Sequence, residues 1–159
     1  MLKDLREENN YYEIQQFRQI WVWLILLLVE FALLFTILSG MINLLVSIII
    51  ISIGFGFIWL LYRMKLITII NEDGINIIFA PFTNFIIPFN KIKKYQIRQY
   101  RPIIEYGGWG IRYSKYGKAY NVSGKIGLQI ELSNGKRLLI GTQNPDALLQ
   151  TLNEIINKN

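Results

Sequence analysis

The fold is decided by residues 20–62, which read IWVWLILLLVEFALLFTILSGMINLLVSIIIISIGFGFIWLLY. This stretch contains one formal charge, Glu30, which is typical of segments that cross the hydrocarbon core of a membrane. A polar turn at residues 39–43 divides it into two spans, residues 20–38 and 44–62. Each span is close to the roughly 20 residues that a helix needs to cross a bilayer. The sequence therefore predicts a transmembrane hairpin of two helices.

Lys and Arg residues flank this hairpin at its two ends but not at its turn. Lys3, Arg6 and Arg18 precede the first span, and Arg63 and Lys65 follow the second. Because these residues are enriched in cytoplasmic segments, we expect a multi-pass protein of the cell membrane with both termini in the cytoplasm. The acidic residues before residue 20 and the lack of a small-residue cleavage site disfavour a cleaved signal peptide.

The predicted hairpin divides the chain into three parts. Residues 1–19 form a cytoplasmic N-terminal segment, residues 20–62 the hairpin, and residues 63–159 a cytoplasmic domain. The last part contains 14 Lys and Arg against 6 Asp and Glu, a formal charge of +8, whereas the whole chain has +6. A basic domain fixed beside an anionic leaflet is attracted to it by about 1 kcal/mol per basic residue that reaches the surface.

Glu30 lies near the middle of the first span. Inserting an acid there costs about 3 kcal/mol, which the apolar residues of the same helix outweigh. One interpretation makes Glu30 a relay for protons or cations. The other makes it a protonated carboxyl group that is hydrogen-bonded to a backbone carbonyl or to Ser52 on the second helix.

Small residues recur every four positions in both spans and predict where the helices touch. They are Ala32, Thr36 and Gly40 in the first span, and Ser52 and Gly56 in the second. Glu30 lies about 200° around the helix from Ala32, so a contact through the small residues would turn Glu30 toward lipid or toward another subunit. This geometry motivates a hypothesis that the protein is a homo-oligomer.

The cytoplasmic domain shows short strands followed by one helix. Asp73-Gly74 and Asn134-Gly135 are hairpin turn signals, and Pro145 suits the first position of an amphipathic helix that Asn144 would cap. The predicted strands are residues 66–70, 75–79, 91–101, 109–113, 119–122, 126–132 and 136–141. The predicted fold class is therefore an α+β membrane protein, with a seven-stranded antiparallel barrel or sandwich and a C-terminal helix.

Two short motifs carry a resemblance to a known group. Gly74-Ile75 opens the second predicted strand, and Ile87-Pro88-Phe89 with Ile92 precedes the third, although Asn71 and Phe89 stand where Thr and Trp are frequent. With the hairpin and the C-terminal helix, this pattern resembles bacterial proteins that carry a membrane-tethered pleckstrin-homology-like domain. Residues 105–112, EYGGWGIR, are similar to a signature of small uncharacterised prokaryotic membrane proteins. The resemblance implies a fold and leaves the function open.

The glycine-rich stretch and the basic residues supply the candidate binding site. Tyr106, Trp109, Arg112 and Tyr120 could grip an anionic headgroup or a peptide. The alternative is a glycine bulge at a barrel corner with Trp109 in the core. The basic candidates are Lys93, Lys94 and Arg98, which could equally form a solvated basic face. Nucleic acid is not expected, because a tethered domain meets the leaflet first.

Composition limits the chemistry that the chain can perform. It contains no Cys and no His, which excludes disulfides, ordinary zinc sites and Ser-His or Cys-His catalysis. We therefore expect no enzymatic activity, no metal and no cofactor. The predicted function is a membrane-anchored binding or scaffolding module for a protein partner or anionic lipid. The alternative is an oligomeric transport or proton-relay element that uses Glu30.

Overall fold

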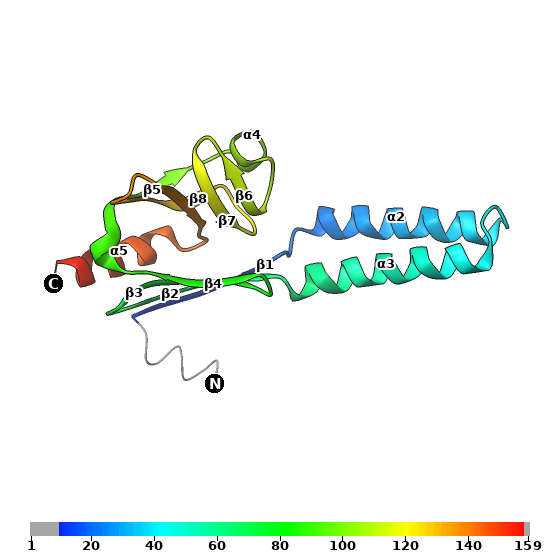
Figure 1. Ribbon diagram of the computed structural model, residues 1–159, viewed down its shortest axis with the longest axis horizontal. Helices are drawn as coiled ribbons and strands as arrows, with labels where there is room; N and C mark the ends of the chain where they lie inside the picture. Colours follow the sequence, from blue (N-terminus) through cyan, green and yellow to red (C-terminus); the bar gives the residue numbers. More distant parts are fainter. Residues whose placement is uncertain (1–9, 158–159) are drawn as a thin grey trace. The chain divides into compact units, whose positions relative to one another are not determined.

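The structure is a computed structural model that describes residues 10–157 (Figure 1). Residues 1–9 of the predicted cytoplasmic segment, with Lys3 and Arg6, lie outside the described residues. The chain forms two compact units. One is the helical hairpin, residues 17–64, and the other combines the N-terminal residues up to Gln16 with residues 65–159, and is called the β domain below.

The hairpin consists of α2 (Ile20–Leu38) and α3 (Leu44–Arg63). Both helices are long and apolar enough to span a membrane, as predicted. Asn43 begins α3 as its N-cap, because its Oδ1 accepts a hydrogen bond of 2.9 Å from the Val46 N–H. At the other end of α3, the Arg63 guanidinium lies 5.6 Å from the centre of the Trp59 ring.

The face between α2 and α3 is not the one that the small residues predicted. Of the five predicted small residues only Thr36 is half-buried, whereas Ala32, Gly40, Ser52 and Gly56 are exposed, and a Cβ on Gly56 would meet nothing within 4 Å. Instead, the less exposed positions recur at helical spacing. They are Val22, Trp23, Leu26, Glu30, Leu33, Thr36 and Ile37 in α2, and Ser47, Ile50, Gly54, Ile58, Leu60 and Leu61 in α3.

Glu30 therefore points into the hairpin. A Cβ on Gly54 would lie 2.7 Å from Glu30 Oε2 and 2.8 Å from its carboxyl carbon, so a larger residue at position 54 would require this carboxyl group to move. Ser52 is exposed and forms no hydrogen bond with Glu30 within the described part of the chain. The expectation that Glu30 faces lipid or another subunit was tied to the small-residue contact and fails with it.

This geometry predicts different effects for two neighbouring glycines. Gly54→Leu forces its side chain against the Glu30 carboxyl group and should weaken the hairpin by about 1–3 kcal/mol, as overpacking does. Gly56→Leu, the matched control, enters open space and should be nearly neutral. Thermal unfolding in detergent, followed by the helical circular dichroism signal, measures the difference. Equal midpoints for the two variants would contradict the placement of Glu30.

The first sheet of the β domain, sheet A, is an antiparallel meander. It contains β1 (Tyr11–Gln16), β2 (Lys65–Asn71), β3 (Gly74–Ala80) and β4 (Thr83–Ile87), in that order. Strand β1 pairs with β2 from Tyr11↔Ile70 to Gln16↔Lys65, so the hairpin is inserted between two paired strands. Sequence analysis predicted β2 and β3 but neither β1 nor β4.

The second sheet, sheet B, has the strand order β5-β8-β9-β7-β6. Its strands are β5 (Ile92–Gln99), β6 (Gly110–Ser114), β7 (Gly117–Asn121), β8 (Ile126–Leu132) and β9 (Arg137–Gly141). The 3-10 turn η1 (Phe89–Lys91) leads into β5, the short helix α4 (Pro102–Tyr106) joins β5 to β6, and α5 (Pro145–Ile156) ends the domain. Strands β7 and β9 are parallel, whereas the other pairs are antiparallel.

The predicted seven-stranded antiparallel barrel or sandwich is wrong in strand number and in strand direction, and the sheets do not close into a barrel. Residues 10–157 contain nine strands in two open sheets, and no ladder joins the sheets. Strand β5 pairs with β8 and not with its chain neighbour β4, which leaves β4 and β5 as edges. The α+β class and the C-terminal helix are confirmed.

The core of the β domain lies where the inner faces of the two sheets meet α5 (Figure 1). Phe79 of sheet A and Tyr120 of sheet B are in ring contact, with centroids 6.5 Å apart. Leu148, Leu152 and Ile155 form the buried face of α5. Pro145 begins this helix as predicted, but Asn144 makes no side-chain cap.

Strand β1 is fastened to the rest of the domain by a buried carboxylate. One oxygen of Glu13 accepts hydrogen bonds from Tyr11 Oη at 2.5 Å and from Thr142 Oγ1 at 2.7 Å. The other accepts from Gln15 Nε2 at 3.1 Å and from the backbone N–H of Gln143 at 2.7 Å. Burial, followed by the bond to Glu13, raises the pKa of the Tyr11 phenol, which keeps it protonated as a donor.

Candidate functional site

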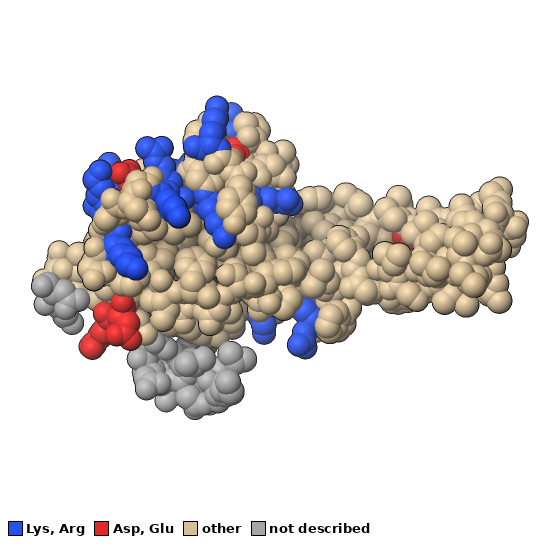
Figure 2. Space-filling model, viewed as in Figure 1, with Lys and Arg blue, Asp and Glu red and all other residues tan. Residues whose placement is uncertain are grey.

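Basic residues of the β domain are concentrated on sheet B and its loops. Residues 91–137 contain 11 of the 17 Lys and Arg residues of the chain, whereas residues 66–90 contain none. Figure 2 shows these side chains gathered over the part of the domain that sheet B forms. The exposed members are Lys91, Lys93, Lys94, Arg101, Arg112, Lys115, Lys125, Lys136 and Arg137. Sheet B therefore presents a strongly positive surface.

The two acids in the same segment are both held in ion pairs. Glu131 lies 3.3 Å from Lys93 Nζ, and Glu105 lies 2.9 Å from Arg98 Nη1. The Arg98 guanidinium also donates to Gln129 Oε1 at 3.1 Å and to Tyr106 Oη at 3.3 Å. Because these acids are satisfied by Lys93 and Arg98, they leave the remaining exposed cations without internal neutralisation.

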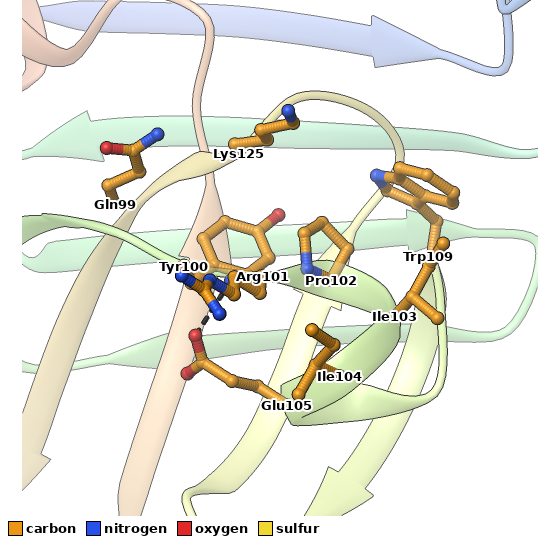
Figure 3. Close-up of a pocket in the computed structure, with 9 residues that line it drawn as sticks. All are labelled: Gln99, Tyr100, Arg101, Pro102, Ile103, Ile104, Glu105, Trp109 and Lys125. Carbon is orange, nitrogen blue, oxygen red and sulfur yellow. Dashed lines mark hydrogen bonds between the residues drawn. The ribbon is translucent and has the colours of Figure 1, made fainter.

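An open pocket of about 730 Å³ lies beside α4 (Figure 3). Figure 3 shows Trp109 next to Ile103 on one side of the pocket. The lining residues are Gln99, Tyr100, Arg101, Pro102, Ile103, Ile104, Glu105, Trp109 and Lys125. The pocket thus combines two cations, one indole and an aliphatic pair around a single acid.

Local sequence explains why α4 forms at this point. Pro102 occupies its first turn, where a missing N–H costs nothing, and Gly107 ends it with φ 71°. The Glu105 side chain turns back to accept a 2.7 Å hydrogen bond from the Arg101 N–H, which braces the first turn (Figure 3). Pro102 and Tyr106 are buried, whereas Ile103 and Ile104 are 67% and 75% exposed.

Trp109 of the glycine-rich stretch lines this pocket, whereas Arg112 is not a lining residue and is linked to it only by a hydrogen bond to Trp109. Trp109 is half-buried and donates its indole N–H to the Gly124 carbonyl at 3.3 Å, and Arg112 Nε donates to the Trp109 carbonyl at 2.9 Å. Gly108 and Gly110 have φ of 122° and 114°, which other residues rarely adopt. Trp109 is therefore not a core residue at a barrel corner.

The two predicted tyrosines are core residues. Tyr106 is 4% exposed and packs edge-on against Tyr100, with ring centroids 6.0 Å apart. Burial raises the pKa of Tyr100 to about 12, and its hydroxyl accepts a 3.0 Å bond from Asn121 Nδ2. Tyr120 is 3% exposed and lies 5.1 Å from the Phe85 ring. Neither tyrosine presents a face to solvent.

The predicted basic residues are not brought to this pocket as a group. Lys93 is paired with Glu131, and Arg98 is paired beneath α4 with Glu105. Lys94 and Arg98 line a second, polar hollow of about 280 Å³ on sheet B, together with Arg137. Of the seven predicted binding residues, only Trp109 lines the pocket, and Arg112 is hydrogen-bonded to it.

The structure also locates the groups that a relay through Glu30 would need. Thr36 Oγ1 donates to the Leu33 carbonyl at 2.7 Å, and Ser47 Oγ donates to the Asn43 carbonyl at 3.0 Å, so each hydroxyl is satisfied within its own helix. Residues 10–157 contain no cluster of three or more acids that could hold a metal ion. The relay therefore stays a prediction without a described polar chain.

Sequence reasoning missed Arg101, Ile103, Ile104 and Lys125. The signals were present, since Pro102 followed by Gly107 is the usual frame of a short helix. The five residues of α4 are too few to show helical periodicity. Lys125 is brought beside Tyr100 by a hydrogen bond of 2.8 Å from the Tyr100 N–H to the Lys125 carbonyl, which local sequence does not reveal.

Together, the fold and the pocket define an α+β protein in which two apolar helices, each long enough to span a membrane, join a two-sheet domain with a basic face. A model of a family of unknown function, DUF6141, matches residues 2–158, so the chain belongs to that family. No curated protein and no solved structure matches the chain. The pleckstrin-homology-like resemblance accordingly stays an expectation.

Proposed function

We propose that this protein is an integral membrane protein whose β domain is a binding or scaffolding module at the cytoplasmic face of the cell membrane. Its ligand is an acidic protein partner or an anionic lipid. The observation that carries the proposal is the one-sided charge of the β domain. Nine exposed cations lie on sheet B and its loops, and eight of them lie outside the two ion pairs, which Lys93 and Arg98 form with Glu131 and Glu105. Such a surface attracts anionic ligands and repels cationic ones.

Several features support a binding function over an enzymatic one. The chain lacks Cys and His, and the described acids near the pocket are held in ion pairs. The pocket beside α4 offers apolar walls and cations, which are means of recognition. The two apolar helices would hold this surface close to a leaflet, where binding gains from a high local concentration.

Site-specific photo-crosslinking in living cells tests the proposal. A photoreactive amino acid replaces Arg112, which is exposed and hydrogen-bonded to the pocket residue Trp109, and the control replaces Asn134 in the exposed β8–β9 turn. We expect protein or lipid adducts from position 112 and at least tenfold fewer from position 134, because about 1.4 kcal/mol of preferential binding gives that ratio. Equal or absent adducts at both positions would contradict a binding function for this face.

A further inference from the structure

We propose that the tip of α4 inserts into an anionic bilayer surface, with Ile103 and Ile104 among the acyl chains and Arg101 and Lys125 on lipid phosphates. This inference deepens the proposed function by naming its ligand class. It rests on that function only in placing the β domain beside a membrane.

The short helix α4 exposes two adjacent isoleucines. Ile103 and Ile104 are adjacent and are 67% and 75% exposed, although the same helix buries Pro102 and Tyr106 at its two ends. The helix is thus anchored by its flanks and displays its apolar middle. Scattered apolar side chains on a surface are ordinary, but a contiguous pair on a braced turn is typical of a contact site.

Hydrogen bonds and an ion pair hold α4 in place at both of its ends. Glu105 is bonded to the Arg101 N–H and paired with Arg98, and Arg98 in turn bonds to Gln129 of β8 and to Tyr106. At the C-terminal end, the N–H groups of Gly107 and Gly108 donate to the carbonyls of Ile103 and Pro102, each at 2.9 Å. A tip held in this way loses little conformational entropy when it enters an interface.

Basic and aromatic side chains lie around the two isoleucines in the pocket lining. Arg101 and Lys125 are exposed on the same pocket, and neither side chain forms an ion pair among residues 10–157. The only acid in the lining, Glu105, is neutralised by Arg98. Trp109 lies beside Ile103, and indole rings favour the headgroup level of membranes (Figure 3).

An apolar tip with cations and an indole around it matches the layers of an anionic leaflet. Acyl chains receive the isoleucines, the headgroup level receives Trp109, and the phosphates receive the basic residues. A protein groove would be an alternative receptor for two isoleucines. The exposed cations and the two apolar helices of the same chain favour the lipid.

The test uses the full chain in nanodiscs. Because the protein contains no Cys, Ile104→Cys provides one labelling position for an environment-sensitive fluorophore, and Asn134→Cys provides the control position. The discs contain phosphatidylcholine alone or mixed with phosphatidylglycerol, together with a lipid that carries a quencher on its acyl chain. We expect quenching at position 104 in the anionic discs and none at position 134.

Charge variants then identify the phosphate contacts. Arg101→Gln combined with Lys125→Gln should lower the ratio of inserted to free α4 about 30-fold, since each basic residue at a membrane surface contributes about fivefold. Lys115→Gln combined with Lys136→Gln removes the same charge from exposed positions outside the pocket lining and should change the ratio less than threefold. The change of less than threefold is expected because Lys115 and Lys136 would attract the anionic surface only at long range, where salt screens the interaction.

Three results overturn the inference: no quenching at position 104, equal quenching in neutral discs, or equal loss from the two double variants. These results leave the proposed function standing if the photo-crosslinks at position 112 yield protein adducts. If neither lipid nor protein adducts form, the proposed function fails independently of the nanodisc result.

Discussion

Glu13→Ala will lower the free energy of unfolding of the β domain by about 3–5 kcal/mol. The Glu13 carboxylate accepts four hydrogen bonds, from Tyr11, Thr142, Gln15 and Gln143, and it is 5% exposed. Its removal leaves buried donors without an acceptor, which costs about 1–3 kcal/mol for each group that water cannot reach. Removing one charged partner from a buried hydrogen-bond network typically costs about 3–5 kcal/mol.

Hydrogen exchange of the backbone amides of β1 and β9 measures this loss in the full chain. A loss of 3 kcal/mol corresponds to exchange about a hundredfold faster when opening is at equilibrium. Glu72→Ala is the matched control, because Glu72 is an exposed acid in the β2–β3 turn, and it should change exchange less than threefold, within about 0.5 kcal/mol. Unchanged protection in Glu13→Ala would show that β1 is not held by this carboxylate.

Gly74→Val should strongly destabilise sheet A. Gly74 begins β3 at φ 147°, and a Cβ there would collide with the Ile87 carbonyl and lie 2.9 Å from Pro88 Cα. The backbone would have to leave both this conformation and the β3–β4 pairing. Strain of this kind with displaced backbone costs on the order of 3 kcal/mol or more.

Gly135→Val is the matched control for this prediction. It has φ 79°, so it shares the backbone strain, but a Cβ at this position meets nothing within 4 Å. Chemical unfolding in detergent, followed by the near-ultraviolet circular dichroism of the aromatic core, compares the two variants. A larger loss in Gly135→Val than in Gly74→Val would contradict the close approach of β3 to the Ile87 carbonyl.

Prediction succeeded where one physical signal dominated. The two long apolar helices were predicted because residues 20–62 contain one charge, and this signal is local to the segment. Strands β2, β3, β8 and β9 were predicted from β-branched or alternating residues with Asp73-Gly74 and Asn134-Gly135 as turns. Both turn pairs connect neighbouring strands in the structure.

Strand β1 was missed because its pattern is inverted. Its inward face contains Tyr11, Glu13 and Gln15, and Ile14 is on the exposed face. Prediction from apolar periodicity expects apolar residues on the buried face, so it assigns this segment to a polar terminus and not to a strand. The partners that make the inward face acceptable, Thr142 and the Gln143 N–H, lie about 130 residues away in the chain and leave no local trace.

The strand order and the site depend on the same kind of long-range information. Strand β9 lies between β8 and β7 and is parallel to β7, which a model of sequential hairpins does not anticipate. The site prediction selected the glycine-rich stretch, of which Trp109 lines the pocket, but it treated Tyr106 and Tyr120 as surface groups. Their phenyl rings fill the core, and composition alone does not show which side of a strand is covered.

We propose that α2 and α3 cross the membrane and that the β domain lies on its cytoplasmic side. Two single-cysteine variants test it most directly: Met41→Cys in the turn of the hairpin and Asn134→Cys in the β domain, both at exposed positions. A membrane-impermeant maleimide is applied to intact cells and to permeabilised cells. We predict that position 41 reacts in intact cells and that position 134 reacts only after permeabilisation. Labelling of both positions under the same condition, or labelling of position 134 but not position 41 in intact cells, would contradict this topology.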